Sequence, residues 1–264
     1  MTQKVHRILP AAVLGALATS GHAWTAIYTG SSVSGITGNA LSVQATFQTR
    51  QTGSQWFLDV TLTNTSNDVS GLKPADILTG LFWTLPNPVA LAPVSASRNG
   101  SVVWQSGSIL AGVPNDVGGE WAYQSGLNYA STTGVFGVSA AGLGLFGPGD
   151  RFNPSQNLNG PVGVGGLEYG ILPNLASWPS DANAPVAAAP LVSNSVTFVF
   201  STGGSELSAL PTNVWGQYGT GLYEPSLQLT GGSVQPQGVP VPEPVTVGLG
   251  AGVLAAAALR RRRR

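Results

Sequence analysis

Short alternations of apolar and polar residues recur along most of the chain. In the clearest stretch, residues 56–63, every second residue from Trp56 to Leu62 is apolar, and the residues between them from Asp59 onward are polar. This period of two predicts a half-buried β-strand. The same pattern predicts further strands at residues 41–49, 77–85, 101–105, 120–124, 134–138, 166–172, 195–201 and 222–230. No stretch of the body has the period of an amphipathic helix of ten or more residues.

Glycine and proline separate these segments. The chain has 36 glycines and 19 prolines among 264 residues, which indicates many turns between short strands. Many short strands with such turns favour an all-β fold, a β-sandwich or jelly-roll-like single domain. We place this body at residues 24–230, and we expect the Gly/Pro-containing residues 231–241 to be a linker.

The first 23 residues have the layout of a secretory signal peptide. Lys4 and Arg7 form a basic start, residues 8–18 are mostly apolar, and Gly21 and Ala23 put small residues at a cleavage site. An apolar run of about eleven residues is too short to span a membrane, which needs about twenty. We therefore expect export, with a signal peptidase cutting after Ala23.

The last 23 residues combine three elements. A proline strip, which disfavours helix, is followed by the apolar segment 245–259 and a basic end. We expect residues 245–259 to form a short transmembrane helix, which would reach about 22 Å, less than the roughly 30 Å of a hydrocarbon core, with the basic end on the cytoplasmic side. The residues of the strip and the basic end are Pro242, Glu243, Pro244, Arg260, Arg261, Arg262, Arg263 and Arg264.

This order of elements resembles the PEP-CTERM sorting signal over residues 242–264. The resemblance implies that an exosortase, an integral membrane enzyme, processes the tail after a transient stay in the inner membrane of a Gram-negative bacterium. It also implies a final place at the cell surface or in the extracellular matrix, beside exopolysaccharide. The alternative is an ordinary C-terminal tail anchor.

Charge excludes one class of partner. Between Trp24 and Pro244 the chain has four bases and eleven acids, a net charge of −7. Nucleic acid binding needs a basic surface, so we expect no nucleic acid partner.

The missing residue types exclude several chemistries. The chain has no cysteine, and its two histidines, His6 and His22, lie in the leader. The exported body therefore lacks disulfides, a histidine base for a serine nucleophile and the usual zinc ligands. The run from Gly142 to Gly147 precedes Pro148, which favours a glycine-rich turn over a dinucleotide-binding helix start. We expect no cofactor, although calcium stays open through oxygen ligands at Asp116, Asp150 and residues 64–68.

Two functions remain open. We expect a non-enzymatic, structural or adhesive protein of the matrix, which could bind sugar through aromatic rings if these are not core residues. The alternative is a carbohydrate-active enzyme that uses two carboxylates. The candidate sugar-binding residues are Trp121, Tyr123 and Trp215, and the candidate acids are Glu120, Asp150, Glu168 and Glu224.

Overall fold

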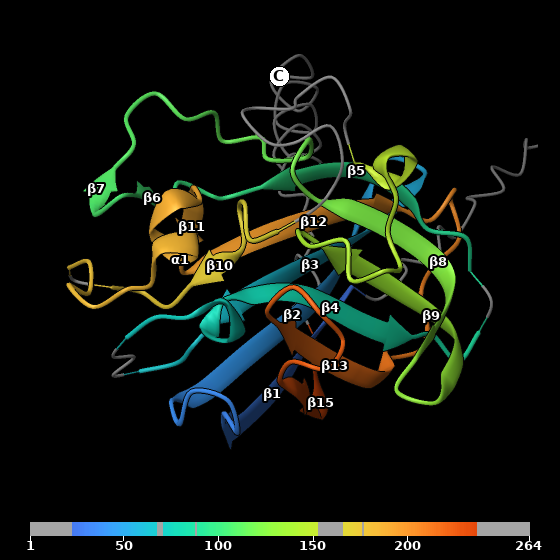
Figure 1. Cartoon of the computed structure of the whole chain (residues 1–264). Helices are drawn as coiled ribbons and strands as arrows, with labels where there is room; N and C mark the ends of the chain where they lie inside the picture. Colours follow the sequence, from blue (N-terminus) through green and yellow to red (C-terminus); the bar gives the residue numbers. More distant parts are fainter. Residues whose placement is uncertain (1–22, 68–70, 88, 153–165, 176, 237–264) are drawn as a thin grey trace, which may run out of the picture.

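The computed structural model describes residues 23–67, 71–87, 89–152, 166–175 and 177–236, and it consists mostly of β-strands in two facing sheets (Figure 1). Helix in this part is limited to α1 (Ala184–Ala188) and two single turns, η1 (Pro74–Asp76) and η2 (Pro148–Asp150). The predicted all-β, sandwich-like fold is confirmed. The signal peptide and the sorting tail lie outside the described residues.

The first sheet, sheet A, has six strands, and every neighbouring pair is antiparallel. Its long central strands are the ones whose alternation is strongest in the sequence. In spatial order the strands are β15 (Thr230–Pro236), β1 (Trp24–Val33), β2 (Ala40–Thr52), β3 (Gln55–Asn64), β12 (Ser195–Ser201) and β5 (Ala92–Ser97).

The second sheet, sheet B, is mixed, because β10 and β11 pair in parallel while the other pairs are antiparallel. Strands β8 (Ala122–Tyr129) and β9 (Thr132–Ser139) form a hairpin, and this hairpin belongs to sheet B because β9 pairs with β4. The other strands, in spatial order, are β14 (Ser226–Gln228), β13 (Thr212–Tyr218), β4 (Leu78–Thr84), β10 (Ile171–Leu172), β11 (Leu191–Ser193), β6 (Val103–Gln105) and β7 (Ser108–Ile109).

The main core lies between the two sheets. Strands β2, β3 and β12 bury every second side chain, as their sequence pattern predicts. At the centre, the rings of Phe47 and Trp83 meet edge to face with centroids 5.6 Å apart, and Phe200 contacts Trp83 at 5.8 Å. Burial of these large apolar surfaces is the main favourable term in folding.

The two sheets differ on their outer faces. Sheet B is covered on its outer side by a second apolar cluster, in which the Phe82 ring stacks on Tyr129 with centroids 3.8 Å apart and Phe146 packs nearby. Sheet A instead carries half-exposed, mostly polar side chains on the face turned away from the core.

The prediction of a linker at residues 231–241 is wrong for residues 231–236. Thr230–Pro236 forms strand β15, which pairs with β1 from Trp24 to Thr29. Gly231 and Gly232 were part of the predicted linker, but they form a bulge in the strand, with φ angles of 140° and 89°. A Cβ at Gly231 would lie 2.3 Å from the Ile27 carbonyl oxygen, so glycine permits close approach of two strands.

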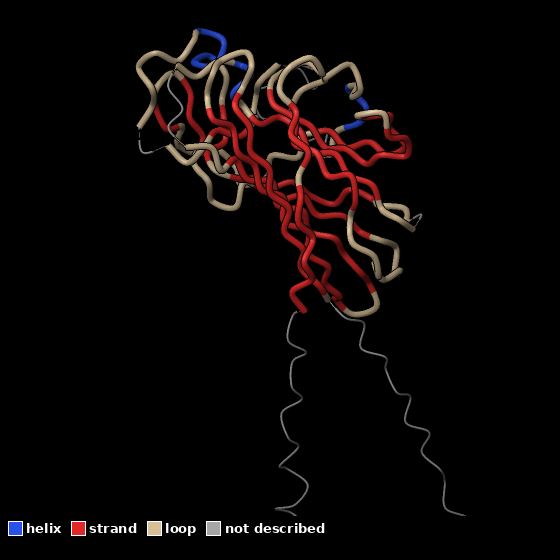
Figure 2. The backbone as a smooth tube through the Cα atoms, turned by 90° about the horizontal axis from the view of Figure 1, so that it is seen from below, coloured by secondary structure: helices blue, strands red, loops and turns tan. Residues whose placement is uncertain are grey.

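The described chain begins and ends at the same end of the molecule. Trp24 and Pro236 are partners in the β1–β15 pair. In Figure 2 the strands, drawn in red, come together toward one end of the molecule. The sandwich therefore extends to Pro236 rather than to residue 230.

Candidate functional site

The three candidate aromatic residues do not form a sugar-binding surface. Trp121 is 0% exposed and meets Phe198 edge to face at 4.9 Å, so the candidate role of Trp121 as a sugar platform is wrong. Tyr123 is half-buried in the same core, and its hydroxyl donates to the Leu91 carbonyl at 3.0 Å. Trp215 lies in the cluster on the other side of sheet B, against Tyr129.

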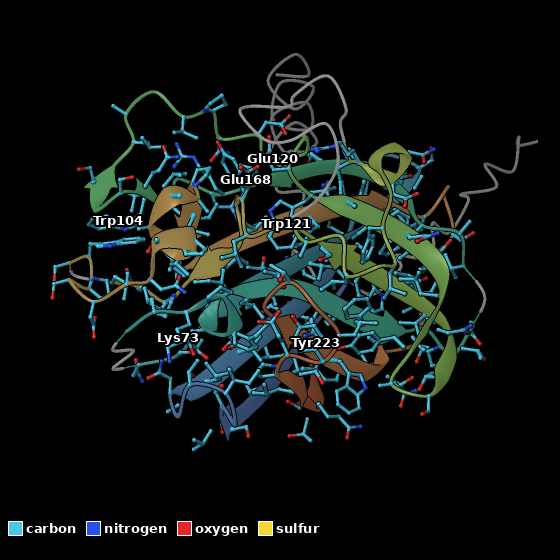
Figure 3. All side chains as sticks on the ribbon, viewed as in Figure 1. Lys73, Trp104, Glu120, Trp121, Glu168 and Tyr223 are labelled. Carbon is cyan, nitrogen blue, oxygen red and sulfur yellow. The ribbon has the colours of Figure 1, made fainter. Side chains whose placement is uncertain are left out.

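The structure brings two of the four candidate acids together. Glu120 lies in the turn before β8, and Glu168 lies in the turn before β10 (Figure 3). Between them in sequence, Arg151 forms a backbone bridge to Ala122 and places its Nη1 4.0 Å from Glu120 Oε2. The side chains of Glu120 and Arg151 are only 2% and 3% exposed. The alternation of residues 120–124 does not predict the burial of Glu120. Strand β8 begins only at Ala122, so Glu120 lies in the preceding turn and not on a face of the strand.

Within this cluster, the surroundings of Glu168 raise the pKa of its carboxyl group. Burial raises the pKa of Glu168, the negative charge of Glu120 raises it further, and Arg151 opposes both. Glu168 Oε2 is buried and accepts no hydrogen bond from the described residues. Burial, followed by the charges of Glu120 and Glu168, also raises the pKa of the Tyr169 phenol to about 12, while Arg98 opposes the shift.

Glu168 opens onto a pocket of about 350 Å³. Glu120 does not line this pocket, so the two carboxylates do not face each other across it. Hydrolysis of a glycosidic bond by two carboxylates needs both groups beside the bond, about 5 to 10 Å apart. The pocket therefore offers one acid in a mainly apolar wall formed by Pro74, Gly166, Leu167, Pro185, Ala188, Ala189 and Thr220.

The other two candidate acids hold turns together. Asp150 accepts a hydrogen bond from the Gly147 amide at 2.7 Å. Glu224 accepts from the amides of Thr220 and Gly221 at 2.5 and 2.8 Å. Carboxylates bonded to backbone amides of their own turn stabilise that turn, so neither points to a reaction.

The open calcium alternative finds no support in the described residues. Asp116 Oδ1 accepts a hydrogen bond from the Gly118 amide at 2.8 Å, and the Asn64 amide donates to the Ile171 carbonyl at 2.9 Å. Within the described ranges, no three or more acidic, histidine or cysteine side chains are grouped where they could hold a metal ion.

The outer face of sheet A is a second candidate site, which no single sequence motif marks. We define it by the outward side chains of β1, β2, β3, β12 and β5. In one row across the sheet, Thr46 of β2 pairs with Ile27 and Thr61, and Thr61 pairs with Thr197. The hydroxyls of Thr61 and Thr197 are hydrogen-bonded at 2.7 Å. The signal was present in the sequence as the polar positions of the two best-predicted strands.

The charges on this face neutralise each other. Arg50 Nε donates to Asp59 Oδ2 at 2.7 Å, and the guanidinium lies over the Phe57 ring, 4.4 Å from its centroid. The other outward side chains on the five strands are mostly hydroxyls, amides and aliphatic groups, and they include Thr25, Ile27, Thr29, Ser31, Val33, Ala40, Ser42, Gln44, Thr46, Gln48, Thr61, Thr63, Ser95, Ser97, Thr197, Val199 and Ser201.

No protein-family model, no curated protein and no solved structure matches this chain. Among the residues that the structure places, no helix is long and apolar enough to cross a membrane, and the segment predicted to do so, 245–259, lies outside them.

Proposed function

We propose that this chain is an exported bacterial surface protein. In this proposal a signal peptidase removes residues 1–23, an exosortase processes the tail at residues 242–264, and the β-rich body remains at the cell surface or in the extracellular matrix. The role of the body is structural or adhesive, in association with exopolysaccharide.

The observation that carries the proposal is the extent of the fold. The sheets use Trp24 through Pro236, and these two residues are paired with each other. Trp24 is the first residue after the expected leader, and Pro236 lies six positions before Pro242. Both expected cuts therefore leave every described strand intact, which is what maturation of a surface protein at both ends requires.

An adhesive body is favoured over an enzyme by the two candidate sites. The buried acid Glu120 does not share the pocket of Glu168, whereas sheet A offers a wide polar face without net charge. Such a face suits many weak hydrogen bonds to a hydroxyl-rich polymer better than it suits catalysis.

Cell fractionation tests the sorting step. We expect the wild-type chain in the surface fraction and the Glu243→Ala variant as a longer, inner-membrane precursor, since the variant alters the proline strip. Glu206→Ala, which removes an exposed acid from the body, is the matched control and should sort normally. Equal sorting of all three chains would contradict the proposal.

One observation favours the alternative of a carbohydrate-active enzyme. Glu168 combines a raised pKa with access to a pocket, as a general acid needs. Release of reducing sugar from the organism's polysaccharide, abolished by Glu168→Gln, would establish this alternative. We expect no such release.

A further inference from the structure

We propose that the outer face of sheet A binds a neutral polysaccharide chain laid across the strands. The proposal deepens the proposed function, because it rests on a matrix polysaccharide being the partner of the body and names the surface and the charge class of that partner. It assigns binding to sheet A rather than to the aromatic residues considered from the sequence.

The first argument is the regular spacing of hydrogen-bonding groups. Thr46, Thr61 and Thr197 stand next to one another on three neighbouring strands, and Ser97 continues the row on β5. Neighbouring strands lie about 4.8 Å apart, so the row presents one hydroxyl at about that interval. Pyranose units joined in a chain present their own hydroxyls at a similar repeat, which allows several units to bind at once.

The second argument is that the row is held in place before any ligand arrives. Thr61 and Thr197 share a hydrogen bond of 2.7 Å, and the Asn99 side-chain amide donates to Thr197 at 2.5 Å. Threonine is also restricted at χ1 because it is β-branched. Side chains that are already ordered lose little conformational entropy on binding, which favours affinity from weak contacts.

The third property of the face is that it carries no net charge. Residues 24–236 have four bases and ten acids, a net charge of −6, but the only ionised side chains among the outward residues of these strands are Arg50 and Asp59, and they are paired. An anionic polymer would gain no attraction at this face and would be repelled by the body as a whole. A neutral polymer fits both facts.

A second copy of this chain fits the face less well. A stable protein interface has an apolar centre and buries roughly 1,200 Å² or more. The apolar side chains on this face include Ile27 and Val33, which Thr29 and Ser31 separate along β1, and Val199 on β12, which pairs with Asp59. Phe57 on β3 is covered by Arg50. They do not join into one apolar patch.

The test is affinity electrophoresis of the full chain in mild detergent, through gels that contain dextran, hydroxyethylcellulose or, as the anionic comparison, alginate. We expect a neutral polymer to slow the wild-type chain and alginate to have no such effect. The double variant Thr61→Val/Thr197→Val removes both partners of one hydrogen bond and keeps their shape, so folding should be preserved. We expect it to weaken binding about tenfold, because two hydroxyl contacts are lost.

Two further variants complete the test. Thr46→Glu places a charge in the centre of the face and should abolish retardation. Thr132→Val alters a half-exposed threonine of β9, outside sheet A, and should bind as the wild type does. Circular dichroism on each variant verifies the fold.

Three results would overturn the proposal. The neutral polymers could fail to slow the wild-type chain, or the face variants could bind as tightly as Thr132→Val. Sedimentation could instead show a dimer that Thr46→Glu dissociates, which would make a second copy the occupant of the face. None of these results depends on the tail, so a failure here is separable from a failure of sorting, which fractionation reports.

Discussion

The backbone of Trp24 lies opposite that of Pro236, in the pair that closes one edge of sheet A. Trp24 is fixed there by two hydrogen bonds, from its backbone nitrogen to Thr49 Oγ1 at 3.0 Å and from its indole nitrogen to the Leu207 carbonyl at 2.6 Å. Even fully extended, the chain from Pro236 to Val245, where the predicted membrane segment begins, reaches at most about 32 Å. In the proposed sorting step, this end of the sandwich would therefore lie within that distance of the membrane.

The first prediction is that the exported protein begins at Trp24. Cleavage after Ala23 leaves β1 complete, and the small residues Gly21 and Ala23 suit signal peptidase. N-terminal sequencing of surface material should give the sequence that starts Trp24-Thr25-Ala26. A terminus upstream of Ala23 would show that the leader is retained or cut elsewhere.

The second prediction is that residues 230–236 stabilise the folded body, whereas residues 237–242 do not. A chain that ends at Pro236 should unfold at the same urea concentration as one that ends at Pro242. A chain that ends at Leu229 lacks β15 and its ladder to β1. It should lose several kcal/mol, at about 1 kcal/mol for each backbone hydrogen bond that no longer forms. If all three chains were equally stable, residues 231–236 would not contribute to the sheet and would belong to the linker.

The third prediction concerns the centre of the core. Trp83 is 0% exposed and contacts Phe47, Phe200 and Phe136. Trp83→Ala should lower the free energy of unfolding by about 3 to 5 kcal/mol, because it leaves a large cavity. Tyr223→Ala, at a side chain that is 86% exposed, should change it by less than about 0.5 kcal/mol. Urea denaturation measures both.

Trp83→Phe refines this prediction. The indole nitrogen of Trp83 is buried and has no hydrogen-bond partner among the described residues. Phenylalanine keeps most of the apolar contact and removes the buried N–H, so the loss should be clearly smaller than for alanine. A loss as large as that of Trp83→Ala would mean that the nitrogen makes an important bond.

The fourth prediction follows from the raised pKa of Glu168. The folded protein holds this proton more tightly than the unfolded chain does, whose pKa is near the ordinary 4.5. The contribution of Glu168 to stability is therefore full below pH 4.5 and declines as the pH rises from there through the folded pKa. Glu168→Gln cannot ionise, so it should remove this decline and be more stable than wild type at pH 7.

Urea midpoints between pH 4 and pH 8 measure this effect. Glu206→Gln, at an exposed acid, is the matched control and should follow the wild-type curve. If Glu168→Gln is less stable than wild type at pH 7, the ionised carboxylate makes a favourable interaction, and the assigned direction of the pKa shift is wrong.

The sequence predicted the strands that bury one face. Strands β2 and β3 alternate over their whole length, so period alone located them. Strand β1 was missed because the residues after Tyr28 are small or polar up to Ser32, so no alternation is visible there. Strands β10 and β11 are too short, at two and three residues, for any period to be visible.

The candidate site was less predictable, because it depends on contacts between distant residues. Glu120 and Glu168 approach each other only through the path of the chain around η2 and β10. The aromatic candidates failed for a related reason: alternation indicates that Trp121 and Tyr123 share a face, but it does not say whether that face is the core. The polar row on sheet A, by contrast, follows directly from predicted strands once their pairing is known.

The central claim, maturation at both ends, is tested most directly by the intact mass of the protein recovered from the cell surface. The account predicts a mass that corresponds to a chain from Trp24 to a residue at or near Pro244, without residues 245–264. In a strain without exosortase, the heavier form that keeps the tail should accumulate instead. A surface form whose mass still includes Arg260 to Arg264 would contradict the account and make the tail a plain membrane anchor.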